Sequence, residues 1–314
     1  MPTVSAGSGD SLTEIYYEVR GDTASSSGRE SDLTTHVSVL MIMGFGATLD
    51  CWEPQLDGLL NHQASPGGVS VSACLLDNRG VGRSGSPKAR QAYTTTIMAE
   101  DCIAVLNALK WDQVHVIGHS MGAMVATQLA SMHPDRLLSL TLISVTAGRW
   151  QSIPTNWAAI KYAWQTFWAS TIEDRAKVDL KFHFMKKTLN EVDAKYKRTR
   201  RSLLHEEYVE GQKGGGVGQP ESGFKGQLNA VWTHRVTDSK VAAIKSGHFP
   251  MMVIHGRYDI LAMAKYDDIQ RARTQMDSMC PEKFKQVKLE AHLQLPNMLA
   301  RRHTGTEGYW QPAA

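Results

Sequence analysis

The chain has 314 residues, of which 42% are hydrophobic and 21% are charged, and its 34 Lys and Arg residues nearly balance 31 Asp and Glu residues, for a net charge of +3. This composition is typical of a globular protein and excludes wholesale disorder. The small net charge does not by itself indicate nucleic-acid binding. The four cysteines contain no C-x-x-C pair, so the sequence indicates neither a zinc ribbon nor a disulfide scaffold.

Two regions of the chain bear on targeting and membrane insertion. Residues 1–7 are polar and lack the basic-then-apolar pattern of a secretory signal. The longest apolar stretch, around residues 37–49, is interrupted by two glycines and is shorter than the ~18 residues that a membrane span needs. We therefore expect a cytoplasmic protein with no transmembrane segment, while a weak transit signal in the Ser-rich residues 25–27 stays an open alternative.

Short apolar runs alternate along the chain with segments of helical period. The alternating polarity of residues 12–19 favours an antiparallel edge strand. Runs that are apolar on both faces predict buried strands at 37–43, 69–76, 113–117, 138–145, 250–254 and 286–289. Helical spacing predicts helices over 97–109, with Thr96 as the N-cap, and over 121–133. This order predicts an α/β fold with a mostly parallel central sheet flanked by helices.

One long segment, residues 148–248, breaks this alternation because its pattern is helical and rich in aromatic residues. It holds 17 Lys and Arg residues against 10 Asp and Glu residues. We expect it to be a helical cap, or lid, inserted into a core formed by residues 1–147 and 249–314. The basic run at 195–201 is typical of a solvated helix face, and the alternative is a weak contact with an anionic substrate, membrane or partner.

Residues 118–122 have the pattern G-x-S-x-G and fall between a predicted strand and a predicted helix. So sharp a turn strains its central residue and leaves no room for flanking side chains, which is why glycines are needed there. The Ser120 hydroxyl would stand at the carboxyl edge of the sheet and at the positive end of the following helix. The motif predicts a nucleophilic serine, and a simple helix cap at Ser120 is the alternative.

A serine nucleophile requires a base, and the base requires an acid that orients it. Asp259 follows an apolar strand and a glycine turn, so we expect it to be the acid, with a plain turn or helix-cap role as the alternative. Among the 12 histidines, His292 follows the last predicted strand and is the expected base, with His303 as its competitor. The order Ser120, Asp259, His292 is the one that this architecture uses.

Acyl transfer also needs donors for the oxyanion that develops in the transition state. The backbone N–H of Met121, directly after the nucleophile, is one expected donor. The backbone N–H of Phe45 is the other, because Gly44 and Gly46 allow the backbone after the strand 37–43 to turn in close.

A second glycine motif, G-x-G-x-x-G at residues 80–85, does not indicate dinucleotide binding. Ser86 and Pro87 follow it where a nucleotide-binding fold would open a helix. We interpret it as a structural loop. The sequence contains no metal-ligand spacing either, so we expect neither a cofactor nor a metal.

Taken together, these motifs resemble the α/β-hydrolase superfamily, in its branch with a helical cap after the sixth strand. The resemblance covers residues 12–292 and rests on the segments 43–46, 77–84, 118–122 and 255–259. It implies the α/β-hydrolase fold, a nucleophile elbow, an oxyanion hole and a Ser-His-Asp catalytic triad. Relatives of this kind include esterases, monoacylglycerol lipases, enol-lactone hydrolases, carbon–carbon bond hydrolases and non-haem haloperoxidases. Dehalogenases and epoxide hydrolases differ, because they place an aspartate where this chain has Ser120.

We therefore expect an enzyme, an esterase-like or lipase-like serine hydrolase that cleaves a carboxylic ester or related acyl bond of a small hydrophobic substrate. The chain departs from the family pattern at Ala291, where the family usually has glycine before the base, and in having only 22 residues after His292. The altered C-terminus and the basic cap motivate one alternative, a ligand sensor on the same fold with slow or no turnover, although a complete nucleophile, acid, base and oxyanion loop can all be assigned. A carbon–carbon bond hydrolase or lyase that uses the same triad is another.

Overall fold

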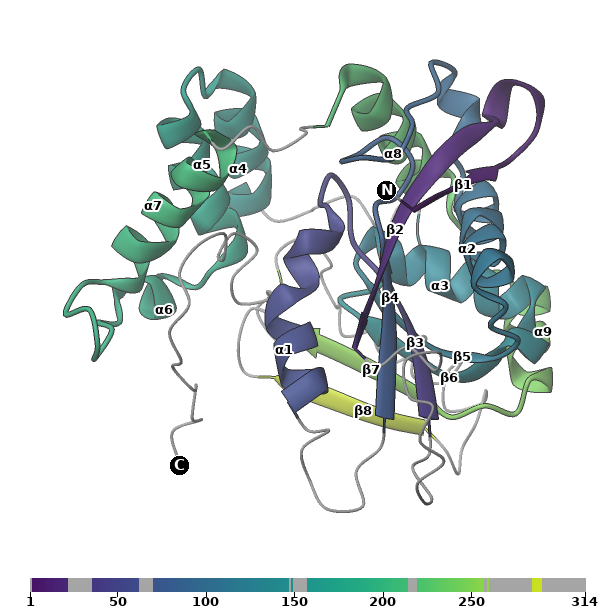
Figure 1. Cartoon of the computed structure of the whole chain (residues 1–314). Helices are drawn as coiled ribbons and strands as arrows, with labels where there is room; N and C mark the ends of the chain where they lie inside the picture. The colour runs from purple at the N-terminus through teal and green to yellow at the C-terminus, as the bar shows by residue number, and fades with distance from the viewer. Residues whose placement is uncertain are drawn as a thin grey trace.

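The apolar runs of the sequence form one eight-stranded sheet in the order β1-β2-β4-β3-β5-β6-β7-β8 (Figure 1). The computed structural model describes residues 2–21, 36–61, 70–146, 148, 157–213, 219–256, 259 and 284–289. The strands are β1 (Thr3–Ala6), β2 (Thr13–Gly21), β3 (His36–Ile42), β4 (Ser70–Leu76), β5 (Val114–His119), β6 (Leu137–Ile143), β7 (Met251–Gly256) and β8 (Phe284–Leu289). Neighbours from β4 through β8 are parallel, whereas β2 is antiparallel to both β1 and β4.

Every strand expected from an apolar run is present, and the mostly parallel sheet is confirmed. The edge position of β2 was wrong, because β1 pairs along its outer side from Thr3↔Tyr16 to Ala6↔Thr13. Only one side chain of β1, that of Ala6, is buried. So short and polar a segment carries no strand pattern of its own, and the pairing with β2 makes it a strand.

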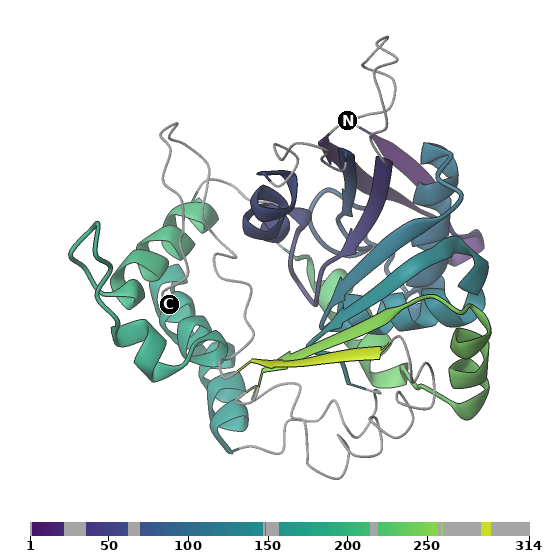
Figure 2. The ribbon, with the colours of Figure 1, turned by 90° about the horizontal axis from the view of Figure 1, so that it is seen from below.

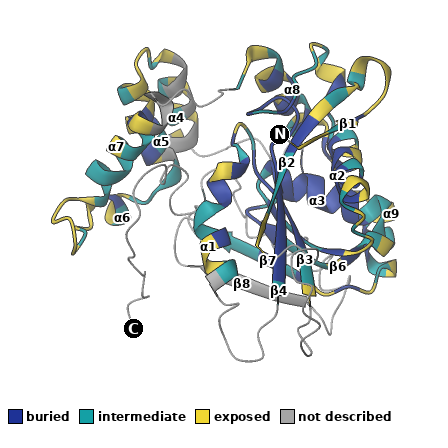
Figure 3. Cartoon of the chain, viewed as in Figure 1, coloured by how far each residue is buried: buried dark blue, intermediate teal, exposed yellow. Residues whose placement is uncertain are grey.

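Alternation along the central strands divides the core into two layers. In β3, Leu40 and Ile42 belong to the cluster under α2 (Thr95–Leu109), α3 (Met121–Met132) and α9 (Asp238–Ser246). Val39 and Met41 point to the other face, where Trp52 and Leu56 pack on them from η2 (Leu49–Trp52) and α1 (Glu53–Asn61). Figure 3 shows the buried residues along the central strands and α3.

The helix predicted over 97–109 begins slightly earlier than expected and has a different cap. Thr94 is the N-cap of α2, because its side chain accepts a hydrogen bond from the Ile97 N–H at 3.1 Å. Thr96 was therefore the wrong cap. The helix predicted over 121–133 is α3.

The predicted insertion 148–248 contains helices of two kinds. The helices α4 (Trp157–Trp168), α5 (Ile172–His183), α6 (Lys186–Asn190) and α7 (Arg200–Lys213) contact one another and lie to one side of the sheet (Figures 1 and 2). We call these four the cap helices. In contrast, α8 (Glu221–Thr233) and α9 belong to the sheet layer, since they contribute Ala230, Val241 and Ile244 to its core. Within the described residues, no helix has both the length and the apolarity required to cross a membrane.

Candidate active site

Ser120 occupies the turn between β5 and α3. Its φ of 54° and ψ of −118° define a conformation that costs a non-glycine residue about 1–3 kcal/mol. Three backbone hydrogen bonds hold it: the Ser120 N–H donates to the Ile143 carbonyl (2.8 Å), and the Ser120 carbonyl accepts from the N–H groups of Ala123 (2.9 Å) and Met124 (3.2 Å). The Ser120 side chain makes no capping hydrogen bond to α3. Ser120 thus occupies the N-cap position of α3, but its hydroxyl does not cap the helix, and the strained turn that a nucleophile elbow requires is present.

Glycines allow three stretches of backbone to meet at this turn. A Cβ on Gly122 would lie 2.1 Å from the Ile42 carbonyl oxygen, and a Cβ on Gly118 would lie 2.5 Å from the Gly122 carbonyl oxygen. A Cβ on Gly44, in the loop after β3, would lie 3.2 Å from the Ser120 Cβ. The loop after β3 therefore passes directly against the serine.

The two predicted oxyanion donors both belong to this junction. Met121 is the first residue of α3, and the first N–H groups of a helix have no partner within the helix. Phe45 lies in the loop against Ser120, and its ring packs edge-on against Phe224 of α8, with ring centroids 5.3 Å apart. The fold thus brings the backbone segments of both donors to the serine, while their roles stay a prediction.

Two buried amide side chains that the sequence analysis missed hold this loop in place. Gln227 of α8 is fully buried; its Oε1 accepts from the Gly46 N–H (2.8 Å), and its Nε2 donates to the Arg79 carbonyl (2.9 Å). At the other end of the loop, the Asn78 Nδ2 donates to the Met43 carbonyl (2.7 Å). Gln227 is 181 residues away from Gly46 along the chain, so no local pattern indicates the contact.

Asp259 lies at the same edge of the sheet as Ser120. Because β5, β6 and β7 are parallel neighbours, their carboxyl ends lie together, and Asp259 follows β7 with its N–H donating to the Gly256 carbonyl (3.2 Å). Burial lowers the pKa of His119, next to the serine, to about 4, and the charge of Asp259 opposes this shift. His183, at the end of α5, lowers it slightly further. Both groups are therefore within electrostatic range of the elbow.

The two candidate bases, His292 and His303, lie outside the described residues. The strand before them is described: β8 runs parallel to β7, so its carboxyl end at Leu289 lies at the edge that carries Asp259. Leu289, three residues before His292 in the sequence, thus lies at the edge of the sheet that carries the site. The choice of base, and with it the complete triad, stays a prediction.

Residues 80–85 form a structural loop, as expected from the sequence, and it packs closely against Asp77. The Gly80 N–H donates to the Gly85 carbonyl (2.9 Å), and a Cβ on Gly82 would lie 2.3 Å from an oxygen of Asp77. That carboxylate accepts the backbone N–H groups of Leu49 (2.7 Å) and Arg83 (2.9 Å). Among the described residues, no group of three His, Cys, Asp or Glu side chains is arranged to hold a metal ion.

The cap presents a row of large apolar side chains to solvent. On α4, Trp157, Trp164 and Trp168 are 83%, 65% and 65% exposed, and Ile160 is 45% exposed. Their spacing of three or four residues places them along one face of the helix. In Figures 1 and 2, α4 is the cap helix nearest to the sheet. These tryptophans do not form a core for the cap, which leaves them accessible to an apolar ligand.

Comparison with known proteins supports the same fold. The profile of the alpha/beta hydrolase fold family matches residues 37–294. The RutD protein of Caulobacter sp. (strain K31), whose name describes a carbamate hydrolase, is 31% identical over 130 residues, or 41% of this chain and 42% of that protein. The chain therefore matches only about two fifths of the length of this relative.

Two solved structures are similar over nearly their whole length. The enol-lactonase from Burkholderia xenovorans LB400 superposes with a TM-score of 0.60 at 20% identity, over 89% of each chain. A thermophilic esterase from Thermogutta terrifontis superposes with a TM-score of 0.61 at 18% identity, over 95% of this chain and 92% of that chain. At such identities the similarity concerns the fold alone. Since the family profile covers most of the chain, and the sheet and the serine turn agree with it, the chain belongs to the alpha/beta hydrolase fold family.

Proposed function

We propose that this hydrolase is a serine hydrolase that cleaves a carboxylic ester, or a closely related acyl bond, of a small hydrophobic substrate. The observation that supports it best is the strained conformation of Ser120 directly beneath the Gly44–Gly46 loop. A strained residue whose side chain makes no capping hydrogen bond is typical of a functional position, because no local interaction of that side chain offsets the cost of the strain. The names of the three relatives described above refer to a carbamate, an enol-lactone and an ester, whose hydrolysis is acyl chemistry at a carbonyl.

The proposed reaction has two halves. The Ser120 Oγ attacks the substrate carbonyl carbon while His292 removes the hydroxyl proton, and Asp259 orients and stabilises the imidazolium. The Met121 and Phe45 N–H groups donate to the oxyanion until the carbonyl re-forms and the leaving group departs with the proton from His292. His292 then removes a proton from a water molecule, which attacks the acyl-enzyme. The carboxylic acid product leaves, and Ser120 takes the proton back from His292.

The cap supplies the preference for a hydrophobic substrate. The exposed row of Trp157, Trp164 and Trp168 on α4 is an apolar surface of the kind that lines ligand sites. We propose that this row covers the acyl or alcohol part of the substrate over the elbow.

Labelling with a fluorophosphonate probe tests this function. We expect one adduct per chain, mapped to Ser120 by peptide mass spectrometry, and hydrolysis of members of a panel of short- and long-chain esters, a lactone and a carbamate. Labelling should be lost in His292→Ala and kept in His303→Ala, and the reverse result would reassign the base. A folded wild-type protein that neither labels nor hydrolyses any panel member would contradict the proposal and favour the ligand sensor.

The loop clamp gives a second prediction. Gln227→Leu removes three hydrogen bonds of the amide, those with the Gly46 N–H, the Gln219 side chain and the buried Arg79 carbonyl, and leaves that carbonyl unpaired. We expect the free energy of unfolding to fall by about 1–3 kcal/mol. We also expect kcat to fall by about 10- to 100-fold with KM little changed, because a displaced oxyanion donor acts mainly in the transition state. Urea unfolding and steady-state kinetics measure the two effects.

A matched control separates positioning from stability. Asn229 lies on the same helix, and its side chain donates to the backbone carbonyl of Tyr93, outside the loop, at 3.0 Å. Asn229→Leu should lower stability but leave kcat unchanged. If both variants lost kcat equally, Gln227 would have only a structural role.

A further inference from the structure

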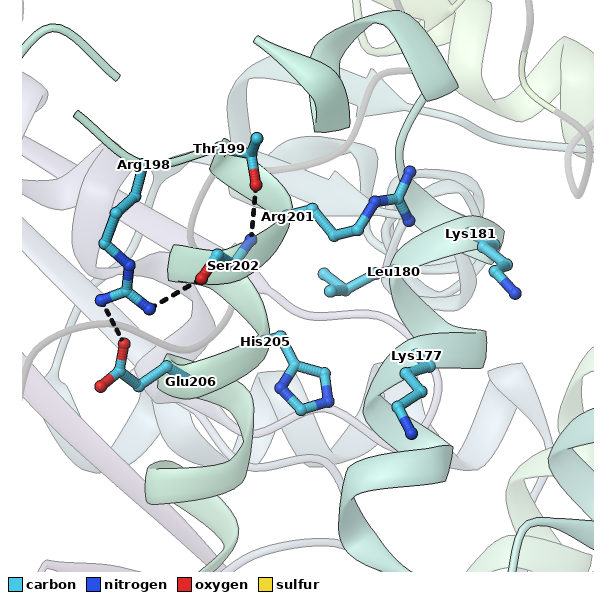
Figure 4. Close-up of a pocket in the computed structure, with 9 residues that line it drawn as sticks. All are labelled: Lys177, Leu180, Lys181, Arg198, Thr199, Arg201, Ser202, His205 and Glu206. Atoms are coloured by element: carbon cyan, nitrogen blue, oxygen red, sulfur yellow. Dashed lines mark hydrogen bonds and ion pairs between the residues drawn. The ribbon is translucent and has the colours of Figure 1, made fainter. Parts of the chain in front are cut away.

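A hollow of about 530 Å³ lies between α5 and α7, away from the serine turn. Figure 4 shows the nine side chains that line it, and none of them is predicted to take part in catalysis. We call it the cap pocket. Its volume is within the range of sites that hold small organic ligands.

Positive charges predominate in the cap pocket. Four of its side chains, Lys177, Lys181, Arg198 and Arg201, are cationic, and only Glu206 is anionic. Two of the cations have a carboxylate partner. Arg198 pairs with Glu206 at 2.7 Å, and Lys177 pairs with Asp174, outside the pocket lining, at 2.8 Å.

The other two cations lack such a partner. Among the described residues, neither Lys181 of α5 nor Arg201 of α7 has a carboxylate within ion-pair distance, and the one hydrogen bond of the Arg201 side chain goes to the neutral amide oxygen of Asn190 (3.3 Å). Figure 4 shows Arg201 extending from α7 toward α5, the helix that carries Lys181. Two positive charges on facing walls repel each other until an anion lies between them.

The remaining polar groups suit an anion with several acceptor oxygens. The Ser202 Oγ accepts from Arg198 (2.7 Å), and the Thr199 Oγ1 accepts from the Ser202 N–H (3.3 Å), so each hydroxyl retains its own O–H to donate. A guanidinium binds two phosphate oxygens side by side, and an ammonium contributes a compact charge. Leu180 is a buried apolar part of the lining, which suits a short organic body next to the charged group.

We propose that the cap pocket binds the phosphate group of a phosphomonoester, carried either by a soluble compound or by a lipid headgroup. A phosphomonoester carries close to two negative charges, so it can neutralise Lys181 and Arg201 together. A single carboxylate can neutralise only one of them. The basic residues 195–201 that the sequence shows as a charged run thus contribute, through Arg198 and Arg201, to a concave site. This proposal does not depend on the proposed hydrolase activity.

Calorimetric titration of the purified full chain with glycerol 3-phosphate at low ionic strength tests the proposal. We expect saturable binding with one site per chain that weakens as salt is added. Lys181→Gln and Arg201→Gln should each weaken it by about 10-fold or more, since each removes a charged donor. Lys181→Arg should preserve binding. Lys187→Gln, which removes an exposed cation of α6 outside the pocket, should have no effect.

Co-sedimentation with vesicles distinguishes the two sources of phosphate. The chain is mixed with phosphatidylcholine vesicles, with and without phosphatidic acid. Binding only to the vesicles with phosphatidic acid, lost in Arg201→Gln, would identify a lipid headgroup. Binding of glycerol 3-phosphate without binding to either kind of vesicle would identify a soluble ligand. Absence of both, or equal weakening by Lys187→Gln and Lys181→Gln, would overturn the proposal.

Discussion

Replacing Ser120 with alanine is expected to lower ester hydrolysis by about 10⁴- to 10⁶-fold and to abolish fluorophosphonate labelling. The reason is that the Oγ is the only atom at the elbow proposed to bond to the substrate, and water attacks a carbonyl far more slowly than an activated serine. KM should change little, because the hydroxyl contributes mainly after binding. The measurement is kcat and KM for the best ester of the panel. A variant that kept a large part of the wild-type rate would show that the nucleophile lies elsewhere.

The effect of Ser120 replacements on stability distinguishes a catalytic serine from one that stabilises the fold. Because the Ser120 side chain makes no capping hydrogen bond, Ser120→Ala should change the free energy of unfolding by less than about 0.5 kcal/mol. A serine whose hydroxyl caps the helix would lose about 1 kcal/mol. Ser120→Gly should instead stabilise the protein by about 1 kcal/mol, since glycine adopts a φ of 54° without strain. Urea unfolding of the three proteins distinguishes these outcomes.

The largest effect on stability is expected from Asp101→Asn. The Asp101 carboxylate of α2 forms a two-point contact with Arg79, with both distances 2.6 Å and both side chains buried. Burial raises the pKa of Asp101, and the hydrogen bonds from Arg79 oppose this shift. Asparagine would leave a guanidinium charge buried without a counter-charge, at a cost of about 3–5 kcal/mol. Urea unfolding monitored by circular dichroism measures it.

The neighbouring residue supplies the control. Glu100, on the same helix, pairs with the His133 Nε2 at 3.0 Å in an exposed position. Glu100→Gln should therefore cost less than about 1 kcal/mol. If Asp101→Asn lowered stability no more than Glu100→Gln, the buried pair would not contribute as proposed. The Arg79 carbonyl also accepts a hydrogen bond from Gln227, whose Oε1 holds the Gly46 N–H, so the buried pair supports the residue that fixes the loop after β3.

Several elements of the site could be predicted because their signals are local. The G-x-S-x-G pattern reports a turn that only glycines next to the serine can permit, and a Cβ on Gly122 would indeed lie 2.1 Å from a backbone oxygen. Asp259 was expected because an acid after an apolar strand and a glycine turn lies at the carboxyl edge of a parallel sheet. The base is a different case, since His292 and His303 lie outside the described residues and their roles stay predictions.

The sequence by itself determined the parallel strands, the elbow and the family, because apolar periodicity and glycine requirements arise between residues close in the chain. Tertiary structure alone decided that β1 lies outside β2 at one edge of the sheet, that α8 and α9 pack on the sheet, and that Gln227 holds a loop 181 residues away. It also decided that Lys181 and Arg201 line one pocket from two helices. Such contacts depend on how separate elements pack, and the sequence around one residue of the contact does not indicate which distant residue is its partner.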